Sequence, residues 1–403
     1  TLRRPPHALP PPGWLCELLE LLARTAASRG RATMGARCCA GWERGGPAAA
    51  RVLRVTREVG EVGPAPPGAR YPAAWGTQVV WRVRDLVVGN EAVFNESRKK
   101  KPRGFRGGSG GGAVACLDPL AEDGSGRCDF CEWKTATAAD SWGRAERPGA
   151  VTASNLWRLG AQHGLCLFKR HDPLDFSRDD LVDVLEASQD WFEASLAASG
   201  RSRPLFIWNC LPRAGASQFH GHAQLFLGDE HLPQPRRVWE GDARHRRAHG
   251  VGYIEDLAAA HDEFGVLHRV RRPSRGTEGA PSLTLQGEGA CIFPSLCPAQ
   301  DMELNVIGAG LRDPGFQQAM FMALRFLIDD LGVTSFGACI YAEAVEPAYQ
   351  QMLARIVSRG GTEGNRSSDY GSLEVFGGVS VGKTSPFILS DLLGDALRAP
   401  RAD

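Results

Sequence analysis

The sequence has no run of 18 or more apolar residues and almost no net charge. A transmembrane helix needs about 20 consecutive apolar residues, so none is predicted. Lys and Arg together number 47 against 46 Asp and Glu, and the formal net charge of +1 gives no electrostatic reason to expect nucleic acid or a membrane surface as partner. Hydrophobic residues make up 43% of the 403 positions, which is enough for a sizeable globular core.

The sequence also lacks a disulfide framework. Its 11 cysteines are odd in number and irregularly spaced, which argues against a secreted protein and for a reducing compartment. We therefore expect a cytoplasmic or organellar protein, the organelle being a chloroplast or a mitochondrion. One pair of cysteines stands apart, because Cys128 and Cys131 in RCDFCEW have the spacing of a metal knuckle.

The apolar pattern divides the chain into four segments. Residues 1–70 have little periodic signal and many Pro, Gly and Ala, so we expect a largely disordered or targeting extension. The other segments are a first half at 71–240, a connector at 241–289 that we expect to be irregular, and a second half at 290–395. A basic, glycine-rich insertion at 97–112 interrupts the first half and is typical of a flexible loop.

Both halves show the period expected of alternating strands and helices. The first half has a predicted strand at 77–88, and then predicts strand, helix, strand, turn and strand at 163–169, 176–199 (with Ser177 as N-cap), 204–211, 212–217 and 219–228. The second half predicts two strands, a helix and two strands at 290–296, 302–308, 313–332, 334–344 and 369–378. This indicates an α+β fold built as a pseudo-repeat, each half an antiparallel sheet with flanking helices.

A row of polar side chains follows the predicted strand at 219–228. Alternate residues of a strand share a face, so His220, His222 and Gln224 project together while Ala223 and Leu225 project the other way. Buried polar groups without partners cost about 1–3 kcal/mol each. The row is therefore expected to serve metal ligation, nucleophilic catalysis or anion binding.

The stretch NCLPRAGASQFHGHAQ resembles the active-site segment of the histidine-triad (HIT-like) superfamily. It is similar to the branch with His-x-His-x-Gln, which holds galactose-1-phosphate uridylyltransferases and diadenosine tetraphosphate phosphorylases. Asn209 and Ser217 match an asparagine and a serine of that pattern. The resemblance implies two HIT-like halves, of which the second, having no such histidines, is degenerate.

The same resemblance assigns roles to individual residues. His222 would attack the α-phosphorus of a nucleotide to form a nucleotidyl-histidine, and a backbone carbonyl would fix its tautomer. Gln224 would donate its amide to a phosphate oxygen. The phosphates would be held by Asn209 and by the turn residues Gly215, Ala216 and Ser217.

A metal site is the second implication. Uridylyltransferases of this branch have a CxxC, then a histidine after a strand, then the first histidine of HxHxQ. Cys128, Cys131, His171 and His220 match that order, and this closed Cys2His2 set would hold a structural zinc. The alternative is that these cysteines are free and His171 is an ordinary loop residue, as in the phosphorylases, which have no such cluster. The segment at 154–170, with Asn155 and His163, is also somewhat similar to the phosphorylases.

The predicted function is ping-pong nucleotidyl transfer. A nucleotide sugar or dinucleotide would donate a nucleoside monophosphate to His222, and a sugar 1-phosphate would accept it. Two alternatives stay open. One is phosphorolysis of a dinucleoside polyphosphate or nucleotide sugar, with inorganic phosphate as acceptor. The other is a non-catalytic subunit of an organellar complex. The oligomeric state, a homodimer included, is left open.

Overall fold

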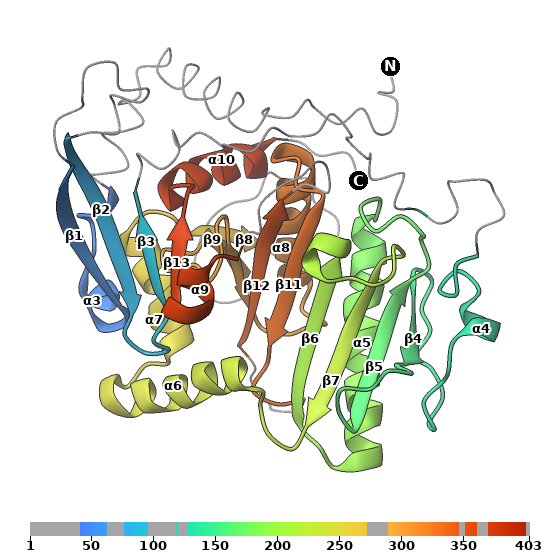
Figure 1. Ribbon diagram of the computed structural model, residues 1–403. Coiled ribbons are helices and arrows are strands. Elements are labelled where there is room, and N and C mark those ends of the chain that lie inside the picture. Colours follow the sequence, from blue (N-terminus) through green and yellow to red (C-terminus); the bar gives the residue numbers. More distant parts are fainter. Residues whose placement is uncertain are drawn as a thin grey trace.

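The structure is a computed structural model that describes residues 41–62, 76–95, 118, 127–271, 289–345, 351–360 and 370–399 (Figure 1). The expectations for residues 1–40 and for the insertion at 97–112 lie outside the described residues. Within the described part of the chain, no helix has the length and apolar character needed to cross a bilayer.

A nine-stranded sheet forms the centre of the molecule, with the order β4-β5-β7-β6-β11-β12-β10-β9-β8. All of its neighbouring strands run antiparallel. In chain order these strands are β4 (Ala150–Ser154), β5 (Gln162–Phe168), β6 (Arg203–Cys210), β7 (His222–Gly228), β8 (His268–Arg271), β9 (Gly289–Pro294), β10 (Leu304–Gly308), β11 (Ser335–Tyr341) and β12 (Met352–Gly360).

The helices and short turns complete the set of elements. The helices are α3 (Pro47–Val52), α4 (Trp133–Ala136), α5 (Arg178–Ser199), α6 (Pro233–His249), α7 (Tyr253–Glu263), α8 (Pro314–Arg325), α9 (Ser372–Gly377) and α10 (Pro386–Arg398). A 3-10 turn spans Pro212–Ala214, and a π-helical turn at Phe326–Asp330 extends α8. The N-cap prediction for α5 is confirmed, because Ser177 and Asp180 form a capping box.

The large sheet confirms the predicted pseudo-repeat. The strand order β4-β5-β7-β6 is repeated by β9-β10-β12-β11, and the two halves meet where β6 pairs with β11. The strand predicted at 369–378 is wrong, because this stretch contains the helix α9. The counterpart of β7 is instead β12, whose neighbours β10 and β11 match the neighbours β5 and β6 of β7.

A second sheet was not predicted. It has four strands in the order β1-β2-β3-β13, namely β1 (Leu53–Val62), β2 (Gly76–Asp85), β3 (Glu91–Phe94) and β13 (Val379–Gly382). It corrects the division of the chain: within 1–70, residues 47–62 form α3 and β1, and within 71–95, β2 and β3 belong to this sheet. The connector at 241–289 is also more regular than expected, since it contains most of α6, all of α7 and the edge strand β8.

The two faces of the large sheet are covered differently. Helices α5 and α8 pack on one face, where the largest buried side chains include Trp191, Trp208 and Phe316. On the opposite face, α7 and the small sheet pack against the strands of the second half. They form one apolar cluster with them, in which Trp81 and Phe94 of the small sheet join Phe293 and Leu353 of the large sheet. This face of the second half is therefore covered by other parts of the chain. His222 and Gln224 of β7 lie on the same face of the sheet, in the first half.

The second half has an ion pair where the first half has polar site residues. Gln224 is paired with Ile207, Ile207 with Cys339, and Cys339 with Arg355, so Gln224 and Arg355 lie in one row across the sheet. Arg355 Nε and Nη2 donate to the two carboxylate oxygens of Glu303 at 2.7 and 2.9 Å. Glu303 of this pair is buried, and Arg355 occupies the position on β12 that Gln224 occupies on β7.

Candidate active site and metal centre

Strand β7 positions the two predicted catalytic side chains. His222 and Gln224 pair with Leu167 and Leu165 of β5. Ala223 and Leu225, the alternate residues, are fully buried in the core beneath α5. Burial of that second face fixes the register, because a slip by one residue would turn His222 into the core. The strand begins at His222, so the prediction that His220 belongs to it is wrong; His220 lies just before it.

The ring of His222 is held in one tautomer. Its Nδ1 lies 2.8 Å from the backbone carbonyl oxygen of His220. A carbonyl only accepts, so Nδ1 carries the proton and Nε2 keeps its lone pair. Burial lowers the pKa of His222, whose exposed fraction is 7%, and this favours the neutral ring. Among the residues that the structure describes, none forms a hydrogen bond with Nε2, which is the nitrogen a nucleophile needs free.

Gln224 is fixed from the neighbouring strand. Its Oε1 lies 3.1 Å from Nε2 of His163 on β5. His163 is buried, and its ring stacks on Phe226 with centroids 4.0 Å apart. The amide oxygen of Gln224 is therefore engaged by the protein, and its amide nitrogen is the end left for another acceptor.

The predicted phosphate-binding residues lie on β6 and in the turn that leads from β6 to β7. Asn209 sits near the end of β6, and the 3-10 turn that follows is flanked by Leu211 and Gly215, which have positive φ of 67° and 95°. Gly215 needs this left-handed conformation, which glycine adopts without strain. A Cβ at Gly215 would lie 3.9 Å from Nδ2 of Asn209, so the turn folds back over that amide. Ala216 and Ser217 complete the turn, and Ser217 is exposed.

Contacts with the second half hold this turn in place. Arg213 Nε donates to the carbonyl oxygen of Arg359 on β12 at 3.1 Å. Ser335 Oγ on β11 donates to the carbonyl oxygen of Cys210 at 2.7 Å. The degenerate half therefore supports the conformation of the turn although it carries none of the predicted site residues.

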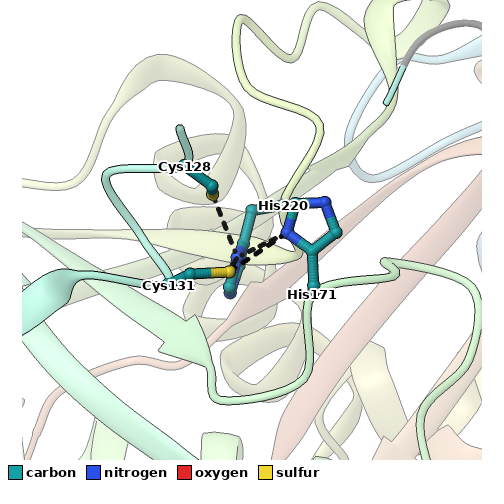
Figure 2. Close-up of side chains that lie close together, drawn as sticks. All are labelled: Cys128, Cys131, His171 and His220. Atoms are coloured by element: carbon teal, nitrogen blue, oxygen red, sulfur yellow. Dashed lines mark hydrogen bonds between the residues drawn. The ribbon is translucent and has the colours of Figure 1, made fainter. Parts of the chain in front are cut away.

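Cys128, Cys131, His171 and His220 come together as one cluster (Figure 2), with one ligand atom from each lying within 4.8 Å of the others. Nδ1 of His220 lies 3.4 Å from both sulfurs and 3.3 Å from Nδ1 of His171, which is 3.3 Å from Sγ of Cys131. Tetrahedral zinc, with bonds of about 2.1 Å to nitrogen and 2.3 Å to sulfur, would place two nitrogens about 3.4 Å apart and nitrogen and sulfur about 3.6 Å apart. The donor set therefore fits a tetrahedral metal ion.

Both histidines turn Nδ1 toward the cluster because their Nε2 atoms are engaged elsewhere. Nε2 of His220 donates to the carbonyl oxygen of Phe168 at 2.7 Å, and Nε2 of His171 lies 2.8 Å from Oδ1 of Asp118. Such outer contacts fix the tautomer of a metal-binding histidine. Burial lowers the pKa of His220 to about 4, and burial together with the neighbouring Cys128 raises the pKa of the Cys131 thiol to about 12. A bound cation would counter this effect, because its charge stabilises the thiolate form of both cysteines.

The Cys2His2 cluster and His222 are physically connected. His220 offers its ring to the cluster and its carbonyl to Nδ1 of His222. Phe130, between the two cysteines, packs edge-on against the ring of His222 with centroids 5.1 Å apart. Phe130 also packs on the small apolar cluster that contains Leu165 and Leu167 of β5. Fixing the loop between Cys128 and Cys131 therefore also fixes the Phe130 ring that packs against His222.

Three contributors were not assigned a role from the sequence: Phe130, Asp118 and His163. Phe130 and Asp118 carry no local signal, because only the folded loop brings them to His222 and His171. His163 does have a signal, since it alternates with Leu165 and Leu167 along one strand face. That periodicity could have placed it in the same layer as Gln224.

The structure resembles solved structures that share little sequence with it. It matches an ADP-glucose phosphorylase from Arabidopsis thaliana, solved with bound ADP-glucose, at a TM-score of 0.57 and 12% identity, covering 78% of this chain and 98% of that one. It matches a GalT-like protein from Arabidopsis thaliana at a TM-score of 0.50 and 12% identity, covering 66% of this chain and 91% of that one. No family model and no curated protein matches the sequence. The chain shares the fold of these two proteins, which confirms the fold that the histidine-triad resemblance predicted.

Proposed function

We propose that the protein is a nucleotidyltransferase that moves a nucleoside monophosphate from a nucleotide sugar to a sugar 1-phosphate through a covalent intermediate on His222. The observation that carries the proposal is the state of the His222 ring. It is neutral, its proton is held on Nδ1 by the His220 carbonyl oxygen, and Nε2 is the free nucleophilic atom.

The reaction would consist of two displacements at one phosphorus. Nε2 of His222 would attack the α-phosphorus, forming a P–N bond while the bond to the bridging oxygen breaks and sugar 1-phosphate departs. A phosphate oxygen of the acceptor would then attack the same phosphorus and break the P–N bond, which restores the neutral ring. Splitting one displacement into two is the usual advantage of covalent catalysis.

The surrounding side chains would hold the charge of the phosphates. Gln224, with its oxygen bonded to His163, would offer its amide N–H groups to a non-bridging oxygen. Asn209 and the turn residues Gly215, Ala216 and Ser217 would hold the departing and entering phosphates. These assignments follow the resemblance, and the turn geometry beside Asn209 supports them.

We infer that the Cys2His2 cluster holds zinc in a structural role. Four protein ligands close the tetrahedron and leave no position for a substrate. The donor distances support zinc, and the connection through His220 and Phe130 suggests what the ion would stabilise. Cys128, Cys131, His171 and His220 would hold it, and the chemistry at phosphorus would be left to His222.

A phosphorylase is the second candidate, favoured by the fold shared with an ADP-glucose phosphorylase. In that case the first displacement is the same and inorganic phosphate is the acceptor. The two functions differ only in the second half-reaction. Supplying the labelled enzyme with a sugar 1-phosphate or with inorganic phosphate would therefore separate them.

The test is intact-mass spectrometry of the purified protein after brief exposure to UDP-glucose, GDP-glucose, ADP-glucose and diadenosine tetraphosphate. We expect a mass gain of one nucleoside monophosphate with at least one donor. His222→Gly should abolish the gain, and added imidazole should restore part of the transfer by occupying the space of the ring. His249→Ala, which changes an exposed histidine on α6, is the matched control. A nucleotide adduct of equal yield in His222→Gly would refute the assignment.

A further inference from the structure

The buried histidine on β5 has a defined protonation state of its own. Nδ1 of His163 lies 3.0 Å from the backbone N–H of Leu159, in the loop between β4 and β5. A backbone N–H can only donate, so Nδ1 must present its lone pair. In the neutral ring the proton is then on Nε2. Burial lowers the pKa of His163, which keeps the ring neutral at pH 7.

The proton on Nε2 has one acceptor in reach. Oε1 of Gln224 is at 3.1 Å, while the other neighbour is Nδ2 of Asn155 at 3.0 Å. The Asn155 amide is itself oriented, because its Oδ1 accepts from the backbone N–H of Trp157 at 2.8 Å. Its nitrogen therefore cannot accept, so with the proton on Nε2 the Asn155 contact is not a hydrogen bond, and Nε2 of His163 donates to Oε1 of Gln224. An amide that accepts through its oxygen must turn its nitrogen the other way.

We infer that His163 is a positioning residue that sets which end of the Gln224 amide faces the bound phosphate, and that the Leu159 N–H sets His163 in turn. This inference rests on the proposed function, because it gives Gln224 its task. Without His163 the amide of Gln224 could rotate by a half-turn, and its oxygen would then face a phosphate oxygen. The Phe226 ring, stacked on the imidazole of His163, holds the plane of that imidazole in place. The orientation of His163, and through it that of the Gln224 amide, is therefore fixed.

The inference can first be tested on the wild-type protein without any substrate. Nitrogen NMR of histidine-labelled protein should show the proton of His163 on Nε2, with His163→Gln used to assign the signal. A proton on Nδ1 would overturn the inference, whatever the protein's activity. This readout is therefore separate from the tests of the proposed function, which concern the nucleotidyl adduct and its dependence on His222.

The kinetic test compares two amides of different length. In His163→Gln the side-chain nitrogen can occupy the place of Nε2 and donate to Gln224, whereas the shorter side chain of His163→Asn cannot reach it. We expect His163→Gln to keep kcat within about threefold of the wild type and His163→Asn to lose about tenfold, with KM nearly unchanged in both. Equal loss in the two variants would overturn the inference.

A double-mutant cycle shows whether His163 acts through Gln224. Gln224→Ala alone should lower kcat by about 100-fold, as removal of one stabilising donor does. In that background His163→Asn should cost nothing more, because there is no amide left to orient. A further tenfold loss would mean that His163 supports the fold or the reaction independently, and would overturn the positioning role.

Discussion

Replacing Cys128 with Ser should remove the metal and lower stability more than it lowers the rate of the chemical step. Cys128 would supply one of the four ligand atoms of the proposed zinc site, and its sulfur lies 3.4 Å from Nδ1 of His220. A site with three ligands should bind zinc at least about 100-fold more weakly, which corresponds to about 2.7 kcal/mol of lost stabilisation. For a chain of 403 residues, with an unfolding entropy of about 2.1 cal/mol/K per residue, that predicts a fall in Tm of about 3 °C.

The chemistry should suffer less because His222 keeps its own contacts. The bond from Nδ1 of His222 goes to a backbone carbonyl, which remains when the metal leaves. We expect kcat, measured well below the new Tm, to fall by less than about tenfold. The loss should come from a loosened Phe130, whose ring packs on that of His222.

The assay pairs metal content by elemental mass spectrometry with thermal unfolding by calorimetry. Cys339→Ser is the matched control, since Cys339 lies on β11, in the large sheet but outside the cluster. Wild type and control should each hold one zinc per chain. The reasoning is wrong if Cys128→Ser also holds one zinc per chain, or if it loses the ion with no change in Tm.

Two further predictions concern buried positions outside the chemistry. Gly164→Ala should destabilise the fold by about 1–3 kcal/mol, because the new Cβ would lie 2.5 Å from the buried Trp191 ring. Gly160→Ala is the control and should be near neutral, because no atom beyond its chain neighbours lies within 4 Å of a Cβ there. Equal free energies of unfolding in urea for the two variants would contradict this. His261 donates from Nδ1 to the Leu257 carbonyl oxygen at 2.7 Å, and burial lowers its pKa to about 4. The unfolded chain, with a histidine pKa of about 6.5, takes up the proton first, so this contribution is complete above pH 6.5 and about 3 kcal/mol of it is lost as the pH falls to 4. His261→Gln should flatten that part of the stability profile, and an unchanged slope would count against the assignment.

The sequence was most informative where local pattern and chemistry coincide. The alternation in HAQLFLG was enough to place His222 and Gln224 on one face, because strand geometry has a strict period of two. Ser177 correctly predicted the start of α5, where it forms a capping box with Asp180. The spacing of Cys128 and Cys131 indicated a candidate metal knuckle, and both residues lie in the Cys2His2 cluster. Each of these signals is contained within a few residues, so no tertiary contact was needed to interpret it.

Prediction failed where the partner is distant in sequence. The stretch at 369–378 has apolar residues at intervals that suit a strand, yet Gly371 and Gly378 bound a short helix there. The N-terminal strand β1 was missed because its structure depends on distant partners. It pairs with β2, and the preceding helix α3 packs on α7. A weakly periodic segment adopts whichever structure its neighbours stabilise, and those neighbours cannot be identified from one sequence.

By itself the sequence indicated the architecture of two repeated halves. Through the resemblance of its short motifs it also indicated four candidate metal ligands and the residue proposed to attack phosphorus. The two halves follow from periodicity, and the candidate site residues follow from the resemblance of short motifs; both are local properties of the sequence. Only the tertiary structure decided which nitrogen of each histidine is free. It placed the carbonyl of His220 behind His222, Asp118 behind His171, and His163 behind Gln224. Proton position depends on the hydrogen-bond partner of the opposite ring nitrogen, and that partner is set by folding.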